Sequence, residues 1–248
     1  MLAETGRRKI MGARMSILES KAAFGPRPAD GWREAIRKGG AFLWLLMHPQ
    51  LARKLGTLST RGYLADTGWI RSTLRPRGAL DLADPMPWAT YPFVSFIGAR
   101  LHPRLRVFEY GAGTSTLYYA ARTAAVFAVE HDATFLRRLT PHLPANARVE
   151  FQAEGSEAYV HAVDGAAPFD LVIVDGRDRV RCATAALAAL APGGVLVLDD
   201  AERQEYAPAP ALLSQAGFRR LDFNGLAAGI VHAKTTAVFY RPNNCLGL

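Results

Sequence analysis

The sequence lacks several features that would assign it to a protein class at once. Only two of its 248 residues, Cys182 and Cys245, are cysteines, too few for a disulfide framework or a thiolate metal site. No run approaches the roughly eighteen apolar residues of a transmembrane helix, and the longest candidate is residues 41–47. The basic N-terminus has neither the apolar segment nor the cleavage site of a secretory signal. We therefore expect a cytoplasmic protein without a transmembrane segment.

Positive charge is in excess, but only in one part of the chain. Residues 1–78 hold 15 Lys and Arg against 5 Asp and Glu, whereas the remainder holds 15 against 17. A basic segment can attract nucleic acid, an anionic lipid surface or an acidic substrate, and it can equally be a solvated helical face, which we favour. We expect residues 1–87 to form a basic helical N-terminal appendage and residues 88–248 to form the main domain.

Beyond about residue 105, short apolar runs alternate with stretches of helical composition. Five of these runs have strand length, namely residues 106–110, 125–130, 147–154, 169–175 and 193–200. The alternation predicts a parallel sheet with helices on both faces, because parallel strands need crossover connections. After the fifth run the pattern changes, and residues 218–223 and 235–241 favour an antiparallel pair. The predicted fold is therefore α/β, with a Rossmann-like, mostly parallel sheet.

A glycine-rich turn follows the first predicted strand. The stretch EYGAGTST, residues 109–116, contains Gly111 and Gly113 but has Thr116 where a dinucleotide-binding turn has its third glycine. Thr114 is placed to begin the next helix. The turn can bring a ligand close to exposed backbone N–H groups, and the missing glycine disfavours a nicotinamide dinucleotide as that ligand.

Two acids near this turn narrow the ligand class further. Glu109 stands just before the turn, where a carboxylate would repel a pyrophosphate and attract a cationic amino-acid group. Glu130 ends the second strand, at about the spacing where an acid accepts hydrogen bonds from the hydroxyls of a ribose. The combination favours a cationic, ribose-bearing cofactor without phosphate.

In this order and spacing, the motifs resemble those of class I S-adenosylmethionine-dependent methyltransferases, over roughly residues 88–241. EYGAGTST is similar to their first motif, AVEHD to their second, FDLVIVDGRDR to their fourth, and LAPGGVLVLDD to the turn and strand that follow. The resemblance implies a seven-stranded sheet with an antiparallel last pair, S-adenosylmethionine as cofactor, and a methyltransferase domain at residues 88–248. VDGRDRVRCA and LVLDDAERQEY further resemble an uncharacterised bacterial subgroup of these enzymes.

The resemblance also implies specific cofactor contacts. Gly111 and Gly113 would meet the methionine part, Glu130 the ribose, and Ser156 the neighbourhood of the adenine. Ser156 is equally placed to cap the helix that follows it. The other residues expected at the cofactor site are Glu109, Thr114, His131 and Asp175.

Carboxylates follow the fourth and fifth predicted strands, whose tips should meet. Methyl transfer to oxygen or nitrogen requires alignment and removal of a proton, and we predict Asp175 and Asp200 as the catalytic residues. These acids are also similar to the metal ligands of catechol-type O-methyltransferases, so a divalent metal stays open as an alternative. We do not favour it and predict no metal site. This chain departs from the catechol-type enzymes at two positions. It has Asp199–Asp200 where those enzymes have Asp-Asn, and Arg177, a poor base, stands close to where they carry a catalytic lysine.

Structural interpretations compete with these roles. Asp178 could cap the helix beginning near Arg179, and Arg203 or Arg177 could hold one acid of the Asp199–Asp200 pair.

Two further segments could shape the acceptor site. Trp88, Tyr91 and Phe93 could line the active site or form the packing face of a helix, which we favour. The glycine-containing segment 225–236 could close over the acceptor.

The predicted function is methyl transfer from S-adenosylmethionine to an oxygen of a small molecule or glycan. The alternative is a non-catalytic methyltransferase-like binding protein that uses its basic N-terminal segment on nucleic acid or an anionic surface. Nucleic acid is not the favoured partner, and a nicotinamide-dependent dehydrogenase is disfavoured by Thr116 and Glu109. The sequence indicates no oligomeric state.

Overall fold

The computed structural model describes residues 31–75 and 79–248 of the chain. Two compact units are present, one ending at Asp66 and the other spanning Thr67–Leu248. Residues 1–30, with which the predicted basic appendage begins, lie outside the described residues. Residues 67–75 and 79–87 cluster with the second unit, and the predicted division of the chain after residue 87 stays a prediction.

The first unit consists of short helices in its described part. They are α2 (Gly31–Leu46), α3 (Pro49–Leu58) and α4 (Tyr63–Asp66). Pro49 opens α3, a position where its missing N–H costs no helical hydrogen bond. None of residues 39–66 is buried.

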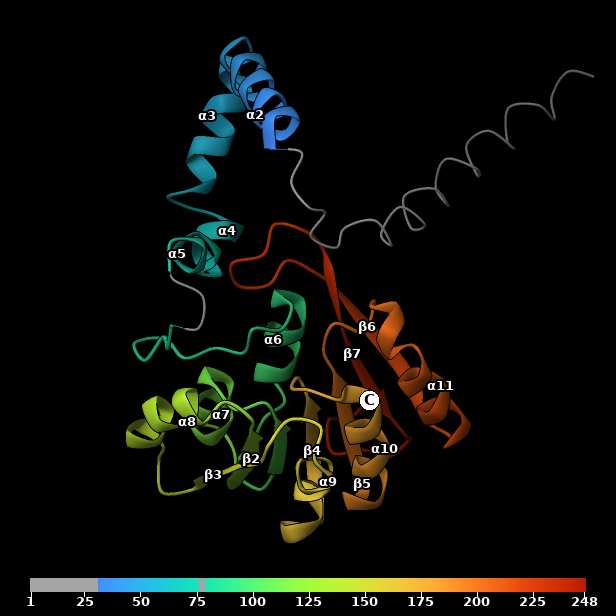
Figure 1. The fold of residues 1–248 in the computed structure, drawn as a ribbon. Helices are drawn as coiled ribbons and strands as arrows, with labels where there is room; N and C mark the ends of the chain where they lie inside the picture. The colour runs from blue at the N-terminus through green and yellow to red at the C-terminus, as the bar shows by residue number, and fades with distance from the viewer. Residues whose placement is uncertain (1–30, 76–78) are drawn as a thin grey trace, which may run out of the picture. The chain divides into compact units, whose positions relative to one another are not determined.

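The second unit is built on one seven-stranded sheet with the order β3-β2-β1-β4-β5-β7-β6 (Figure 1). The strands β1 to β5 are parallel, and β7 pairs antiparallel with both β5 and β6. This confirms the predicted Rossmann-like sheet and its antiparallel last pair. The strands are β1 (Arg106–Tyr110), β2 (Ala125–Glu130), β3 (Ala147–Phe151), β4 (Phe169–Val174), β5 (Leu190–Leu198), β6 (Arg219–Gly225) and β7 (Lys234–Tyr240).

Helices cover both faces of this sheet. The helices of the second unit are α5 (Trp69–Thr73), α6 (Tyr91–Gly98), α7 (Thr114–Ala120), α8 (Ala133–Leu139), α9 (Glu157–Val160), α10 (Arg179–Ala189) and α11 (Pro208–Gln215), with 3₁₀ turns at Thr140–His142, His161–Ala166 and Gln204–Tyr206. Phe108 and Tyr110 pack on the face covered by α10 and α11, whereas Val107 packs on the face covered by α6 and α7. Because successive strand residues point to opposite faces, Glu109 shares the face of Val107, beneath α7.

The strand order reverses between β1 and β4, which lie side by side although β2 and β3 separate them in the chain. In open α/β sheets such a switch point opens a crevice at the carboxyl ends of the strands, where ligands bind. The predicted site residues follow these strand ends. In the described residues no helix is long and apolar enough to cross a membrane.

Candidate functional site

The turn after β1 fits closely against the turn after β4. Gly111 has φ +90°, a conformation that side chains disfavour, and a Cβ there would come 2.9 Å from the Cα of Gly176. Gly113 has extended backbone at the start of α7, and a Cβ there would meet only the Ser115 hydroxyl, at 3.7 Å. Of the two glycines, therefore, only Gly111 is required by the local packing.

Glu109 lies beneath this turn and is fully buried. The Thr116 hydroxyl donates a hydrogen bond of 2.5 Å to Glu109 Oε2 and accepts one of 3.0 Å from the Gly113 N–H. Glu109 Oε1 has no hydrogen-bond partner among the described residues. Burial raises the pKa of Glu109 to about 7, although the neighbouring hydroxyl groups oppose the shift. Thr116, which stands in place of the third glycine of a dinucleotide-binding turn, thus connects the turn to the buried acid Glu109.

Glu130 stands at the end of β2 with its carboxylate fixed by the backbone. Its Oε1 accepts hydrogen bonds from the N–H groups of His131, at 2.8 Å, and Asp132, at 2.7 Å. The Asp132 side chain in turn caps α8. His131 Nε2 accepts a hydrogen bond of 3.3 Å from Arg177 Nε. This local network holds Glu130 and His131 at the carboxyl end of β2, where the strands of the parallel sheet end.

A cavity of about 410 Å³ opens at the switch point, a size within the range of small-molecule sites. Of the residues predicted to bind the cofactor, six line this cavity: Gly111, Gly113, Thr114, Glu130, His131 and Asp175. Glu109 and Ser156 are not on its wall. Ser156 accepts a hydrogen bond of 3.1 Å from the Tyr159 N–H and caps α9, as its structural interpretation predicted.

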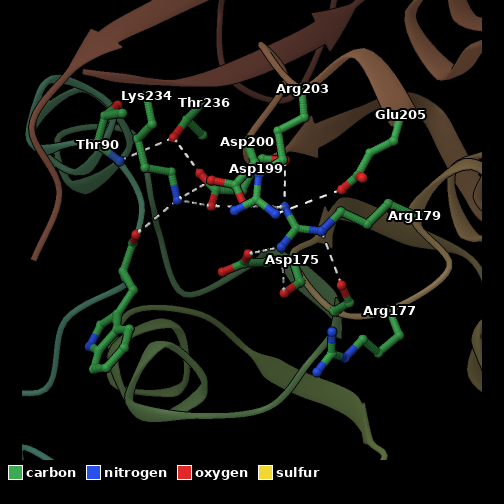
Figure 2. A network of polar contacts seen from close by, with 12 residues as sticks. Thr90, Asp175, Arg177, Arg179, Asp199, Asp200, Arg203, Glu205, Lys234 and Thr236 are labelled. Atoms are coloured by element: carbon green, nitrogen blue, oxygen red, sulfur yellow. Dashed lines mark hydrogen bonds and ion pairs between the residues drawn. The ribbon is translucent and has the colours of Figure 1, made fainter. Parts of the chain in front are cut away.

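At the ends of β4 and β5, acids and cations form a buried network. Figure 2 shows Lys234 reaching Asp199 and Asp200 from one side, with Arg179 and Arg203 on the other. Lys234 Nζ contacts Asp199 Oδ2 and lies 2.8 Å from Asp200 Oδ1. Asp199 is 2% exposed, and Asp200 has φ +52°.

Arg179 joins the acids of both strands. Its guanidinium lies 3.0 Å from Asp175 Oδ1 and 3.4 Å from Asp200 Oδ2. Arg203 Nη2 lies 2.7 Å from Asp200 Oδ2, which confirms the predicted ion pair. The alternative partner, Arg177, is instead 3.6 Å from Glu154.

Asp178 does not cap α10 with its side chain, so that predicted contact is wrong. The residue occupies the N-cap position with φ +50°, and its carboxylate lies 3.0 Å from Arg181 Nη1. The left-handed backbone turns the side chain away from the helix N–H groups.

The two acids predicted to be catalytic have pKa values displaced in opposite directions. Burial, together with the negative charge of Asp199, raises the pKa of Asp175. Burial acts in the same sense on Asp200, but the charges of Lys234 and Arg179 outweigh it and hold the pKa of Asp200 below its usual value. The same cavity therefore has on its wall one carboxyl group that holds its proton to an unusually high pH and one that stays ionised to an unusually low pH.

Lys234, Arg179 and Thr236 were not predicted from the sequence as partners of these acids. Thr236 Oγ1 donates a hydrogen bond of 2.7 Å to Asp199 Oδ1. One signal was available, because Lys234 is the only lysine after residue 54.

Gly176 was also missed. A Cβ on this residue would clash with the Tyr159 hydroxyl and lie 2.9 Å from the Gly111 nitrogen. The turn after β4, which contains Gly176, is therefore as tightly packed as the turn after β1, which contains Gly111.

No group of three or more His, Cys, Asp or Glu in the described residues is arranged to hold a metal ion. Lys234 and Arg179 already contact the acids that resemble metal ligands. The absence of a metal site stays a prediction.

Residues 108–201 match the family model described as a methyltransferase domain. No curated protein matches the sequence of this chain. Similar solved structures include precorrin-6y C5,15-methyltransferase from Geobacter metallireducens, with 16% identity, coverage of 60% of this chain and 86% of that one, and a TM-score of 0.47. Precorrin 8w decarboxylase from Methanobacterium thermoautotrophicum has 18% identity, coverage of 65% and 95%, and a TM-score of 0.46. N-methyltransferase NodS from Bradyrhizobium japonicum has 16% identity, coverage of 60% and 93%, and a TM-score of 0.44. The family match, and not these distant structures, confirms the predicted class of protein.

Proposed function

From the premise that this chain is an S-adenosylmethionine-dependent methyltransferase, we propose that it methylates an oxygen of a small-molecule or glycan acceptor. The observation that supports an oxygen acceptor is the pair of carboxylates with opposite pKa displacements, Asp175 and Asp200, on the wall of one cavity. Environments that separate the pKa values of two acids commonly assign them different roles in proton transfer. A hydroxyl acceptor needs such a proton acceptor.

The residues of the cavity fit the cofactor. The Glu130 carboxylate, already oriented by two backbone N–H groups, is placed to accept hydrogen bonds from ribose hydroxyls. The turn from Gly111 to Ser115 offers backbone groups, and Phe135 contributes an apolar wall. S-adenosylmethionine, when bound, supplies a methyl group activated by a positively charged sulfur.

In the proposed mechanism Asp175 takes the proton of the acceptor hydroxyl as the hydroxyl oxygen takes the methyl group. Burial and the charge of Asp199 raise the pKa of Asp175 to about 8, so its ionised form, which predominates above about pH 8, is a stronger base than an ordinary carboxylate. Asp200 stays ionised between Lys234 and Arg203 and orients the acceptor by accepting a hydrogen bond. Arg179 connects the two acids and keeps their carboxylates in place.

Calorimetric titration with S-adenosylhomocysteine tests the cofactor site. We expect micromolar binding, and for Glu130→Ala a loss of affinity of about 100-fold, because two hydrogen bonds to a charged group disappear. Glu150→Ala, on the exposed strand β3, is the matched control and should bind like the wild type. If the wild type does not bind, the proposed function is wrong.

Asp175→Asn tests the proton-transfer role. We expect kcat to fall by about 100-fold or more while S-adenosylhomocysteine affinity stays near that of the wild type. The amide keeps the shape of the side chain but cannot accept the proton. A variant with unchanged kcat at every pH from 6 to 9 would remove Asp175 from the mechanism.

A further inference from the structure

A second cavity, of about 460 Å³, adjoins the first. The residues on the walls of both cavities are Ala79, Trp88, Thr114, Asp200 and Arg203. The junction therefore contains Asp200, the persistently charged acid of the proposed mechanism. A molecule in the second cavity would meet the cofactor cavity at this carboxylate.

The walls of the second cavity are tied together by segments far apart in the chain. Trp69 Nε1 in α5 donates a hydrogen bond of 2.8 Å to the carbonyl of Ile230, in the loop between β6 and β7. The Gly229 N–H donates one of 2.8 Å to the Ser72 hydroxyl. Figure 1 shows this loop beside α5. The segment expected from sequence to cover the acceptor is thus anchored as a wall.

The charges in this cavity are paired. Arg71 lies 2.7 Å from Asp84 Oδ2, and Arg75 contacts Asp81. The third arginine of the wall is Arg203, which pairs with Asp200. An anionic ligand would have to compete with these carboxylates, whereas a neutral ligand rich in hydroxyl groups can donate to the acids and accept from the arginines.

Trp88 adds an apolar surface at the junction. Its side chain is 46% exposed, whereas its neighbours Tyr91 and Phe93 are buried in the core. The Trp88 carbonyl accepts a hydrogen bond of 3.4 Å from Lys234 Nζ, the group that also holds Asp200. The backbone that carries the ring is therefore fixed relative to the acid. An exposed indole among polar groups suits a ligand with one apolar face and several hydroxyls.

We propose that the second cavity binds the methyl acceptor and that this acceptor is a neutral sugar residue. The apolar face of the sugar ring stacks on Trp88, its hydroxyls bond the Arg71–Asp84 and Arg75–Asp81 pairs, and the hydroxyl to be methylated lies beside Asp200. This inference rests on the proposed function and names the acceptor class for the same site.

The first test measures transfer of tritium-labelled methyl groups from S-adenosylmethionine. The acceptors are 4-nitrophenyl glycosides of glucose, galactose, mannose, rhamnose and xylose, compared with catechol, with glucuronic acid and with a short single-stranded RNA. We expect methylation of at least one neutral glycoside at the sugar. Methylation of only the phenol, the acid or the RNA would overturn the proposed acceptor class.

Variants of the second cavity then test its location. For the accepted glycoside, we expect Trp88→Ala to raise KM about tenfold and Trp88→Phe to restore most of the loss, because an aromatic face remains. Asp84→Ala should raise KM about fivefold while S-adenosylhomocysteine affinity stays unchanged. The controls are Trp44→Ala, an exposed indole of α2, and Glu150→Ala, which breaks an exposed ion pair with Arg148.

The outcomes separate the two proposals. If the wild type does not bind S-adenosylhomocysteine, the proposed function is wrong and this inference is wrong with it. Retained binding with wild-type KM in Trp88→Ala and Asp84→Ala would overturn the second cavity as acceptor site and leave the proposed function standing.

Discussion

The molecule buries acids at two strand ends and stabilises them differently. Beneath the turn after β1, the polar contact of Glu109 is with the Thr116 hydroxyl, and the pKa of the acid rises to about 7. At the end of β5, Asp199 and Asp200 lie against Lys234, Arg179 and Arg203.

The two regions therefore stabilise a buried carboxylate in two different ways. Taking a carboxylate out of water is unfavourable, and the protein offsets that cost with a proton in the first case and with cations in the second. Glu109 is therefore neutral below about pH 7, and it holds the turn after β1 through its hydrogen bond with Thr116. At the end of β5, the cations keep a charged group on the cavity wall, where it can act on a ligand.

The largest expected effect is the loss of the cation. Lys234→Met should lower the free energy of unfolding by about 3–5 kcal/mol, because it leaves Asp199 and Asp200 buried without their closest positive partner. Urea denaturation measures the change. Arg220→Met, which breaks an ion pair with Asp222 near the surface, should cost at most about 1 kcal/mol. Equal losses in the two variants would contradict the comparison.

The next effect is the pH dependence due to Glu109. Its pKa is about 7 in the folded state and near 4.5 in the unfolded state, so the folded protein holds the proton more tightly. Its contribution to stability is fully present below about pH 4.5 and is lost as the pH rises through about 7, a change of about 3 kcal/mol.

Glu109→Gln removes this titration. We expect the stability of the variant, relative to the wild type, to improve between pH 5 and pH 8 in urea denaturation. Glu150→Gln should follow the wild type, because Glu150 is exposed. Parallel curves for the wild type and Glu109→Gln would show that Glu109 is ionised throughout.

A smaller effect is expected for the hydroxyl of the charged cluster. Thr236→Val removes the hydrogen bond to Asp199 and leaves the Thr90 N–H without its acceptor, so we expect a loss of about 2 kcal/mol. Thermal and urea denaturation give the value. Thr184→Val, on the exposed side of α10, is the control, and a loss no larger than in this control would mean that the cations alone hold Asp199.

The smallest effect is expected at the matching hydroxyl beneath β1. Thr116→Val should cost about 1 kcal/mol at pH 6, where the Glu109 carboxyl is mostly protonated. The same change should move the midpoint of the pH dependence upward, because the lost hydrogen bond favours the ionised form. A downward shift would indicate that another group stabilises the ionised acid.

Features encoded by neighbouring residues could be predicted from the sequence. The bounds of β1 and β2 were predicted residue for residue, since apolar runs are local signals. Glu130 at the end of β2 could be related to a ligand by its spacing from the turn, and it lines the cavity.

Contacts between distant segments could not be predicted in this way. Lys234 meets Asp199 and Asp200 because β7 pairs antiparallel with β5, with Ala237 opposite Leu198, and no local pattern encodes that register. The predicted packing role is confirmed for Phe93 and wrong for Trp88, which lines both cavities, whereas Tyr91 is buried and also lines the second cavity. Trp88 precedes the first residue of α6, Tyr91, and therefore lies outside the helix that packs on the sheet.

Lys234 is the only lysine after residue 54, and it is 5% exposed. The second unit therefore presents no accessible side-chain amine while β7 remains paired. Acetylation of this one residue by an amine-selective reagent, followed by peptide mass spectrometry, would report the rate at which the ion cluster opens. The acetylation of Lys234 therefore measures the opening of the ion cluster in the native chain, without a mutation or a dye.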